Sequence, residues 1–141
     1  MISKGEEQRA HLIMKLRGQG IRSASVLSAI ESVPRDIFIE NALKNHAWEN
    51  VTLPIGEGQT ISQPYIVALM TTALNLSGKE IVLEIGTGSG YQASILSLLC
   101  RRVYTIERIK TLHEFSNKKF RELKLNNITT KFGNGSLGWP E

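Results

Sequence analysis

The chain has 141 residues, 41% of them apolar, which is the length of one domain with enough apolar residues for a buried core. No apolar run approaches the roughly 18 residues of a membrane span, and the polar first residues are unlike a secretory leader. A single cysteine, Cys100, excludes an internal disulfide and fits a reducing compartment. We therefore expect a cytoplasmic protein without a membrane partner.

The net charge of +4 is concentrated in one segment. Residues 101–131 hold nine Lys or Arg against three Glu, whereas the rest of the chain is slightly acidic. A basic segment can attract an acidic partner. Aromatic residues do not alternate regularly with these charges in the way that favours binding of single strands, so we interpret the charges as a solvated helix face and expect no nucleic acid partner.

Residues 1–50 are predicted to form a helical cap. Apolar residues at helical spacing predict a helix over residues 6–17. Ser23 suits the N-cap of a second short helix, which must end just before Pro34. Pro34 in turn suits the first turn of a third helix around Phe38.

Residues 51–64 follow neither a helical nor a strand period and contain two glycines and two prolines. A connection of this length without regular structure is often functional, so we interpret it as an active-site loop. Ser62 is predicted to cap the next helix, with Pro64 inside its first turn. One stripe of that helix is predicted to be buried: Ile66, Leu69, Met70, Ala73 and Leu74.

Residues 65–141 continue with alternating strands and helices. The predicted order is strand Ile81–Ile85, helix 91–100, strand Val103–Ile106, helix 109–124 and strand Ile128–Phe132. This β-α-β-α-β order implies parallel strands with right-handed crossovers. The predicted fold class is therefore α/β: one domain in which a helical cap precedes the start of a Rossmann-like, doubly wound sheet.

A glycine-rich turn, Gly86–Gly90, lies between the first of these strands and the following helix, and Glu84 precedes it. Glycines let a ligand approach the backbone, and a helix N-terminus offers free N–H groups. A dinucleotide-binding turn reads G-x-G-x-x-G, but Tyr91 stands where the last glycine would be. The pattern counts against NAD, and an acidic residue beside the glycines suits a cationic cofactor.

Two further strand ends fall at the same edge of the predicted sheet. Glu107 ends the second strand, 21 residues after Gly86, where a carboxylate can accept hydrogen bonds from both ribose hydroxyls. Asn134 and Gly135 follow the third strand, where a side-chain carbonyl can accept a hydrogen bond from an adenine amino group. Each feature alone is typical of a packing turn or a surface carboxylate. Together they favour an adenosine-containing ligand.

Three segments are similar to the bacterial protein-L-isoaspartate O-methyltransferases: Leu53-Pro-Ile-Gly-Glu-Gly-Gln-Thr-Ile-Ser-Gln-Pro-Tyr65, residues 82–92 and residues 104–108. The first is far more specific than the glycine motif, which all class I methyltransferases share. The similarity extends over nearly the whole chain, including Val33-Pro-Arg35. It implies the class I methyltransferase fold and methyl transfer from S-adenosylmethionine to the free α-carboxylate of L-isoaspartyl residues in damaged proteins and peptides, with S-adenosylhomocysteine as product.

The resemblance also implies the roles of individual residues. It makes Ser62 the active-site residue, which orients the substrate carboxylate. It assigns substrate binding to Thr60, Ile61, Ser62 and Gln63. It assigns cofactor binding to Glu84, Gly86, Thr87, Gly88, Gly90, Glu107, Asn134 and Gly135. No metal is expected, because three scattered histidines and a single aspartate offer no ligand set.

The chain departs from the family pattern at two places. Asn134 stands where the family usually has Asp, so an adenine contact would lack charge assistance. The family also continues beyond Glu141 with further strands, one of which would neighbour Ile81–Ile85. We therefore expect an exposed strand edge and weak or no activity. A fragment, a truncated gene and a homodimer that covers the edge are explanations that stay open.

Two other functions also stay open. The chain can be a non-catalytic module that binds S-adenosylmethionine, or a methyltransferase for another carboxylate. Isoaspartyl and aspartyl peptides offered with labelled cofactor separate another carboxylate methyltransferase from the first interpretation. Calorimetric binding of S-adenosylhomocysteine without turnover would favour the non-catalytic module.

Overall fold

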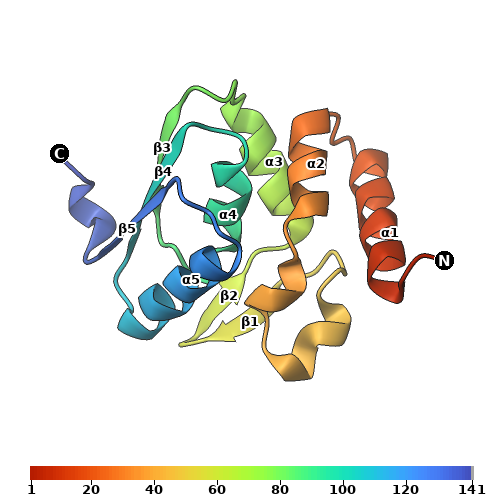
Figure 1. Ribbon diagram of the computed structural model, residues 1–141, viewed down its shortest axis with the longest axis horizontal. Helices are drawn as coiled ribbons and strands as arrows, with labels where there is room; N and C mark the ends of the chain where they lie inside the picture. Colours follow the sequence, from red (N-terminus) through yellow and green to blue (C-terminus); the bar gives the residue numbers. More distant parts are fainter. Residues whose placement is uncertain (141) are drawn as a thin grey trace.

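The computed structural model describes residues 1–140 (Figure 1). The first part contains α1 (Lys4–Gly18), α2 (Ala24–Ser32) and two 3-10 helices, η1 (Arg35–Phe38) and η2 (Asn41–His46). Next come β1 (Leu53–Gly56), β2 (Gln59–Ile61) and α3 (Pro64–Leu74). The last part contains β3 (Ile81–Ile85), α4 (Tyr91–Ser97), β4 (Arg102–Glu107), α5 (Lys110–Glu122), β5 (Ile128–Phe132) and η3 (Gly135–Leu137). None of these helices combines the length and apolar character that crossing a membrane requires.

Serine side chains cap the N-termini of the first two helices. Ser3 and Glu6 form a capping box at α1, in which each side chain accepts a hydrogen bond from the backbone N–H of the other residue. Ser23 caps α2 as predicted, because its hydroxyl accepts from the N–H of Val26. The predicted third helix is only the 3-10 turn η1, and Pro34 is its extended N-cap residue rather than part of its first turn.

Residues 53–61 form an antiparallel β-hairpin, so the prediction of a loop without regular structure is wrong here. The two turn residues, Glu57 and Gly58, both have positive φ, of 55° and 68°. Hairpins joined by two residues favour this conformation, because its twist matches that of the strands. The strands have four and three residues, with a register irregularity between Pro54 and Gly56. Such short, interrupted strands leave no visible alternation in the sequence.

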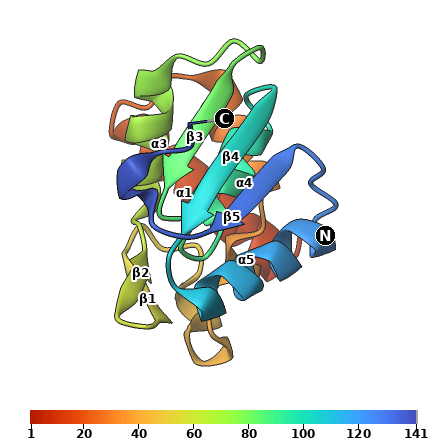
Figure 2. The same ribbon diagram turned by 90° about the vertical axis from the view of Figure 1, so that its left-hand side faces the viewer.

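The main sheet is parallel, in the order β3-β4-β5, which confirms the predicted strands. Helices α4 and α5 pack on one face, where Val103 and Phe120 are buried. Figure 2 looks onto the other face, which only the segment containing η3 crosses. Strand β3 has a partner on one side only, as predicted for an exposed edge. Its alternate residues Ile81, Leu83 and Ile85 point to one face and are 62%, 44% and 54% exposed.

A second core joins the helical cap to α4. It contains buried residues of α1, α2, the β1–β2 hairpin and α3, together with Tyr91 and Ile95 of α4. The rings of Phe38 and Tyr91 meet edge to face, with centroids 5.5 Å apart. Helix α4 therefore lies between the sheet and the cap (Figure 1), and the glycine turn before it is held from both sides.

Helix α3 buries a different stripe from the predicted one. Its buried residues are Pro64, Val67, Ala68 and Thr71. The residues predicted to be buried, Ile66, Leu69, Met70, Ala73 and Leu74, are exposed. Because α3 contains no charged residue, the sequence does not mark which side faces the core. The predicted cap is also wrong: Gln63 is the N-cap residue, and no side chain caps the helix, because Ser62 lies one position too early.

Candidate functional site

A cavity of about 470 Å³ lies where the β1–β2 hairpin, α3, β3 and the glycine turn meet. Its volume is within the usual range of small-molecule sites, about 300–1,000 Å³. The predicted site residues that line it are Thr60, Ile61, Ser62, Glu84, Gly86, Thr87 and Gly88. The structure therefore brings the predicted substrate segment and the predicted cofactor turn to one hollow, although they lie more than 20 residues apart in the chain.

The cavity also runs along the free edge of β3. Residues 82–86 line it in succession, and successive side chains of a strand point to opposite faces. The hollow therefore wraps around the strand edge. Its far wall comes from α3 and α4, through residues that were not predicted to line the site: Ile66, Met70, Thr71, Leu74 and Gln92. Ile66, Met70 and Leu74 belong to the apolar stripe of α3 that was predicted to be buried, and Thr71 and Gln92 carry no signal in the sequence.

The glycines of the turn have different surroundings. A Cβ added to Gly86 would meet no atom within 4 Å, so the space beside this residue is open. A Cβ on Gly88 would lie 3.7 Å from Ile55 Cδ1 in the hairpin. A Cβ on Gly90 would lie 2.9 Å from Phe120 Cε1, too close for any side chain. Gly86 therefore faces the cavity, whereas Gly90 permits close packing of α4 on α5.

Most backbone N–H groups of the glycine turn already donate hydrogen bonds within the protein. Gly86 and Thr87 donate to the carbonyl of Ile106 at 2.8 and 3.2 Å, and Gly90 donates to that of Thr87 at 3.0 Å. The N–H of Gly88 donates to a carboxylate at the end of β4. The prediction of free N–H groups is therefore wrong for these four residues. A turn with few free donors does not favour a phosphate ligand.

Glu84 lines the cavity from β3 and ends a short chain of hydroxyl groups. Thr105 Oγ1 donates to Glu84 Oε1 at 2.6 Å, and Thr87 Oγ1 lies 2.6 Å from Thr105 Oγ1. Burial raises the pKa of Glu84 to about 7; the hydrogen bond from Thr105 opposes the rise, and the charge of Glu107 adds to it. A cation in the cavity would stabilise the ionised form of this carboxyl group.

Glu107 ends β4 and is 5% exposed. Its Oε1 accepts a hydrogen bond from Gly88 N–H and its Oε2 from Ile109 N–H, both at 2.8 Å. The carboxylate thus ties the glycine turn to the start of α5, and it does not line the cavity. Each oxygen keeps a lone pair for a further donor, so the ribose contact stays a prediction.

Four other predicted site residues lie outside the cavity wall: Gln63, Gly90, Asn134 and Gly135. Asn134 Oδ1 accepts a hydrogen bond from Ser136 N–H at 2.9 Å and caps η3. Gly135 packs against β3, since a Cβ added there would lie 2.5 Å from Ile85 Cγ2. The adenine contact of Asn134 and Gly135 therefore stays a prediction.

Ser62 lies directly after β2, at the cavity wall, and is exposed. Its hydroxyl makes no hydrogen bond to any other residue between 1 and 140 and is available to a ligand. Its carbonyl accepts from Arg35 Nη2 at 3.3 Å. Arg35 is fully buried, and in the sequence only the family resemblance marks it.

In the described part of the chain, no three His, Cys, Asp or Glu residues gather as metal ligands would.

Known proteins resemble this chain over most of its length. The family model described as Protein-L-isoaspartate(D-aspartate) O-methyltransferase (PCMT) matches residues 7–141. A protein-L-isoaspartate O-methyltransferase of Parvibaculum lavamentivorans is 54% identical over 140 residues, which are 99% of this chain and 63% of the relative. One of Dictyoglomus thermophilum is 54% identical over 136 residues, covering 96% and 62%. The chain therefore spans a little under two thirds of these relatives.

Solved structures agree with this result. A protein-L-isoaspartate O-methyltransferase matches with a TM-score of 0.85 at 28% identity, over 94% of this chain and 44% of that chain. A dimethyladenosine transferase from Plasmodium falciparum matches with a TM-score of 0.53 at 26% identity, over 56% and 29%. The predicted methyltransferase fold class is confirmed. Because the family model covers all but the first six residues, the chain belongs to the protein-L-isoaspartate(D-aspartate) O-methyltransferase family.

Proposed function

We propose that this chain binds S-adenosylmethionine and transfers its methyl group to the free α-carboxylate of L-isoaspartyl residues in damaged proteins and peptides. The observation that carries the proposal is the single cavity that joins residues 60–62 to the glycine turn and Glu84. Family membership supports the same reaction, because the family is named for it. The relatives are longer than this chain, so their activity is a proposal for these 141 residues.

The residues of the cavity fit the cationic end of this cofactor. An ionised Glu84 would stabilise the positive sulfonium and amino groups, and the space beside Gly86 admits a ligand. Four of the five N–H groups of Gly86–Gly90 are already bonded, which suits a cofactor without a pyrophosphate. Glu84 and Gly86 would therefore hold the methionine end, and the remaining lone pairs of Glu107 would hold the ribose.

The residues of this chain align the reactants and exclude water. Bound S-adenosylmethionine supplies a methyl group that its sulfonium has already activated. The isoaspartyl carboxylate is ionised at neutral pH, so the reaction needs no general base. Ser62 donates a hydrogen bond that orients this carboxylate. The buried side chains of Ile61 and Val67 keep water from the adjoining wall of the cavity.

Two peptides that differ only in an isoaspartyl or an aspartyl residue test the proposal. The purified chain is incubated with each peptide and methyl-labelled cofactor. Label in the isoaspartyl peptide alone, released as methanol by mild base, is the expected result, because only a carboxyl methyl ester is so labile. Label in neither peptide contradicts the proposed activity, and label in both identifies a less selective carboxylate methyltransferase.

Non-catalytic binding of the cofactor is a second candidate function. The observation that favours it is the cavity's open side along β3, where Leu83 and Ile85 are exposed. An open wall admits water to the reacting groups. Calorimetry with S-adenosylhomocysteine distinguishes the two candidates, because binding without methyl transfer supports this second one.

We also propose that a second copy of the chain covers the free edge of β3. An unpaired strand edge with exposed apolar side chains favours pairing, and two β3 strands related by a two-fold axis would pair antiparallel. The exposed side chains of Met70 and Leu74 on α3 line the same hollow and would be covered with it. Sedimentation velocity tests this: a monomer at every concentration contradicts the dimer.

A further inference from the structure

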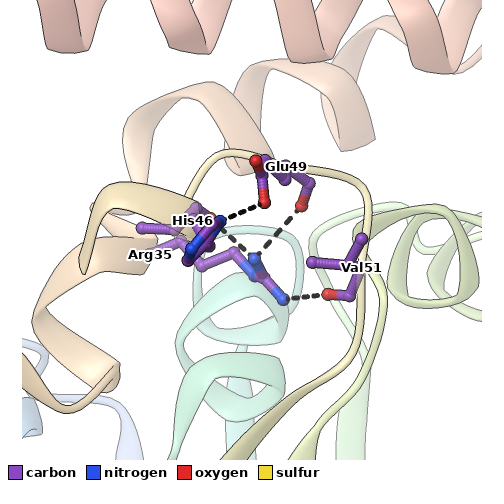
Figure 3. Close-up of polar contacts among 5 residues, drawn as sticks. Arg35, His46, Glu49 and Val51 are labelled. Atoms are coloured by element: carbon purple, nitrogen blue, oxygen red, sulfur yellow. Dashed lines mark hydrogen bonds and ion pairs between the residues drawn. The ribbon is translucent and has the colours of Figure 1, made fainter. Parts of the chain in front are cut away.

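Arg35 is a fully buried arginine that takes no part in either of the ion pairs formed within residues 1–140. Its guanidinium donates instead to four backbone carbonyls, several of which are drawn in Figure 3. Nη1 donates to Ala47 at 2.6 Å and to Glu49 at 3.3 Å, and Nη2 donates to Val51 at 2.8 Å and to Ser62 at 3.3 Å. One side chain thus organises the segment that leads into the hairpin.

The two acceptors of Nη2 stand at opposite ends of the β1–β2 hairpin. Val51 precedes β1 by two residues, and Ser62 directly follows β2. A single nitrogen therefore closes the base of the hairpin and fixes where its second end leaves toward α3. The guanidinium carbon also lies 6.0 Å from the ring centroid of Tyr91, the first residue of α4 after the glycine turn. Arg35 thus contacts both parts of the cavity wall.

This set of contacts requires the shape of a guanidinium. Its planar fork directs two nitrogens to separate pairs of acceptors, whereas a lysine ammonium is a single point of donation. An exposed pair, His46 Nδ1 and Glu49 Oε2 at 2.7 Å, holds the same segment from the solvent side (Figure 3). Exposed pairs of this kind contribute little. The buried guanidinium therefore restrains this segment more than the exposed pair does.

We propose that Arg35 is a positioning residue for Ser62, which it holds at the cavity wall through the carbonyl of Ser62 and the base of the hairpin. The role of Ser62 rests on the proposed methyl transfer, whereas the restraint by Arg35 rests on the contacts alone. Arg35 touches neither the cofactor nor the substrate in this proposal, and its effect reaches the reaction only through Ser62.

Kinetics of the variants Arg35→Lys and Arg35→Met test the proposal. Because a misplacement of about 1 Å can cost about 100-fold in rate, we expect kcat/KM for an isoaspartyl peptide to fall at least about tenfold in both. Affinity for S-adenosylhomocysteine should change by less than about threefold, since the glycine turn keeps its own hydrogen bonds. The matched control is Arg22→Met, because Arg22 also donates to a carbonyl, that of Arg17 at 2.9 Å, but on the exposed end of α1.

A double-mutant cycle with Ser62→Ala separates positioning from general support of the fold. If Arg35 acts through Ser62, Arg35→Lys adds little to the loss that Ser62→Ala causes. Equal losses in both backgrounds overturn the proposal. Unfolding of both Arg35 variants, with loss of cofactor binding, also overturns it, because Arg35 would then support the whole domain.

Amide hydrogen exchange measures the restraint by Arg35 without relying on methyl transfer. If the unmutated chain transfers no methyl group, the function fails but the restraint can still be measured. Faster exchange of amides 52–62 in Arg35→Lys than in Arg22→Met and the unmutated chain upholds the restraint. Unchanged exchange there overturns it.

Discussion

Ser62 combines an exposed hydroxyl without a hydrogen-bond partner in residues 1–140 with a place in the cavity wall. Ser62→Ala is therefore expected to leave the free energy of unfolding within about 0.5 kcal/mol of its original value. It should lower kcat/KM for isoaspartyl peptides by about 10- to 100-fold, the effect of losing one hydrogen bond to a charged group. The control is Ser28→Ala on the exposed side of α2. Equal activity of the two variants contradicts the assigned role.

The raised pKa of Glu84 predicts that the free energy of unfolding falls as pH rises. Its pKa is raised from 4.5 to about 7 by burial. Between these values the unfolded chain has lost the proton that the folded chain retains, so the free energy of unfolding decreases across this window, by up to about 3 kcal/mol. The decrease is absent below pH 4.5 and complete above pH 7. Urea denaturation of the unmutated chain and of Glu84→Gln over this pH range measures the decrease. If the free energies of unfolding of the two proteins change with pH in parallel, Glu84 is not the cause.

Ionisation of the same carboxyl group should also make cofactor binding depend on pH. S-adenosylmethionine is cationic at its sulfonium, so its affinity should rise with pH as Glu84 ionises and level off above pH 7. Glu84→Gln should bind more weakly at pH 8 and lose this rise. Calorimetric titrations at pH 5.5 and pH 8 measure both effects. An equal rise in Glu84→Gln would assign the pH dependence to another group.

At the residue scale, the sequence predicted which segments meet but not how their polar groups pair. Residues 60–62 and Glu84 line one cavity, as the family pattern implied. The use of Glu107 by two backbone N–H groups was not predictable, because it depends on the positive φ angles of the turn. The four carbonyl acceptors of Arg35 were not predictable either, since backbone acceptors leave no mark in a sequence.

At the scale of elements, two similar substitutions in the glycine turn should differ in their main effect, one on stability and the other on ligand binding. Gly90→Ala places a Cβ 2.9 Å from Phe120 at a φ of 95°, so it should lower the free energy of unfolding by about 3 kcal/mol. Gly86→Ala meets no neighbouring atom, so only backbone strain of about 1 kcal/mol is expected. The added Cβ at Gly86 should instead weaken binding of S-adenosylhomocysteine at least about tenfold.

Urea denaturation and calorimetry of the two glycine variants check this contrast. Equal destabilisation by Gly86→Ala and Gly90→Ala would mean that packing does not distinguish the two positions. Unchanged ligand affinity in Gly86→Ala would mean that the ligand does not approach the turn at this residue.

The parallel strands were predictable because each is a short segment rich in β-branched and aromatic residues between turns. The bounds of β3 and β5 agree with the prediction, and β4 is one residue longer at each end. The β1–β2 hairpin and the buried stripe of α3 were not predictable for a different reason. Strands of three or four residues are too short to show alternation, and a helix without charged residues does not mark its solvent face.

At the scale of the whole molecule, the free edge of β3 predicts self-association. Ile81→Lys should shift the chain toward the monomer, because it places a charge on a 62% exposed edge position outside the cavity wall. Stability should change little, since the side chain is already in water. The control is Met14→Lys on α1, which is 70% exposed and distant from β3 in the fold (Figure 1). If Ile81→Lys and Met14→Lys change the sedimentation profile equally, the proposed interface is contradicted.

The cavity wraps around the free edge of β3, so whatever covers that edge also becomes part of the cavity wall. Occupancy of the hollow and coverage of the edge are then thermodynamically linked. If covering the edge tightens ligand binding by some factor, bound ligand strengthens the covering contact by the same factor. A chain that gains ligand affinity as its own concentration rises would display this reciprocity directly.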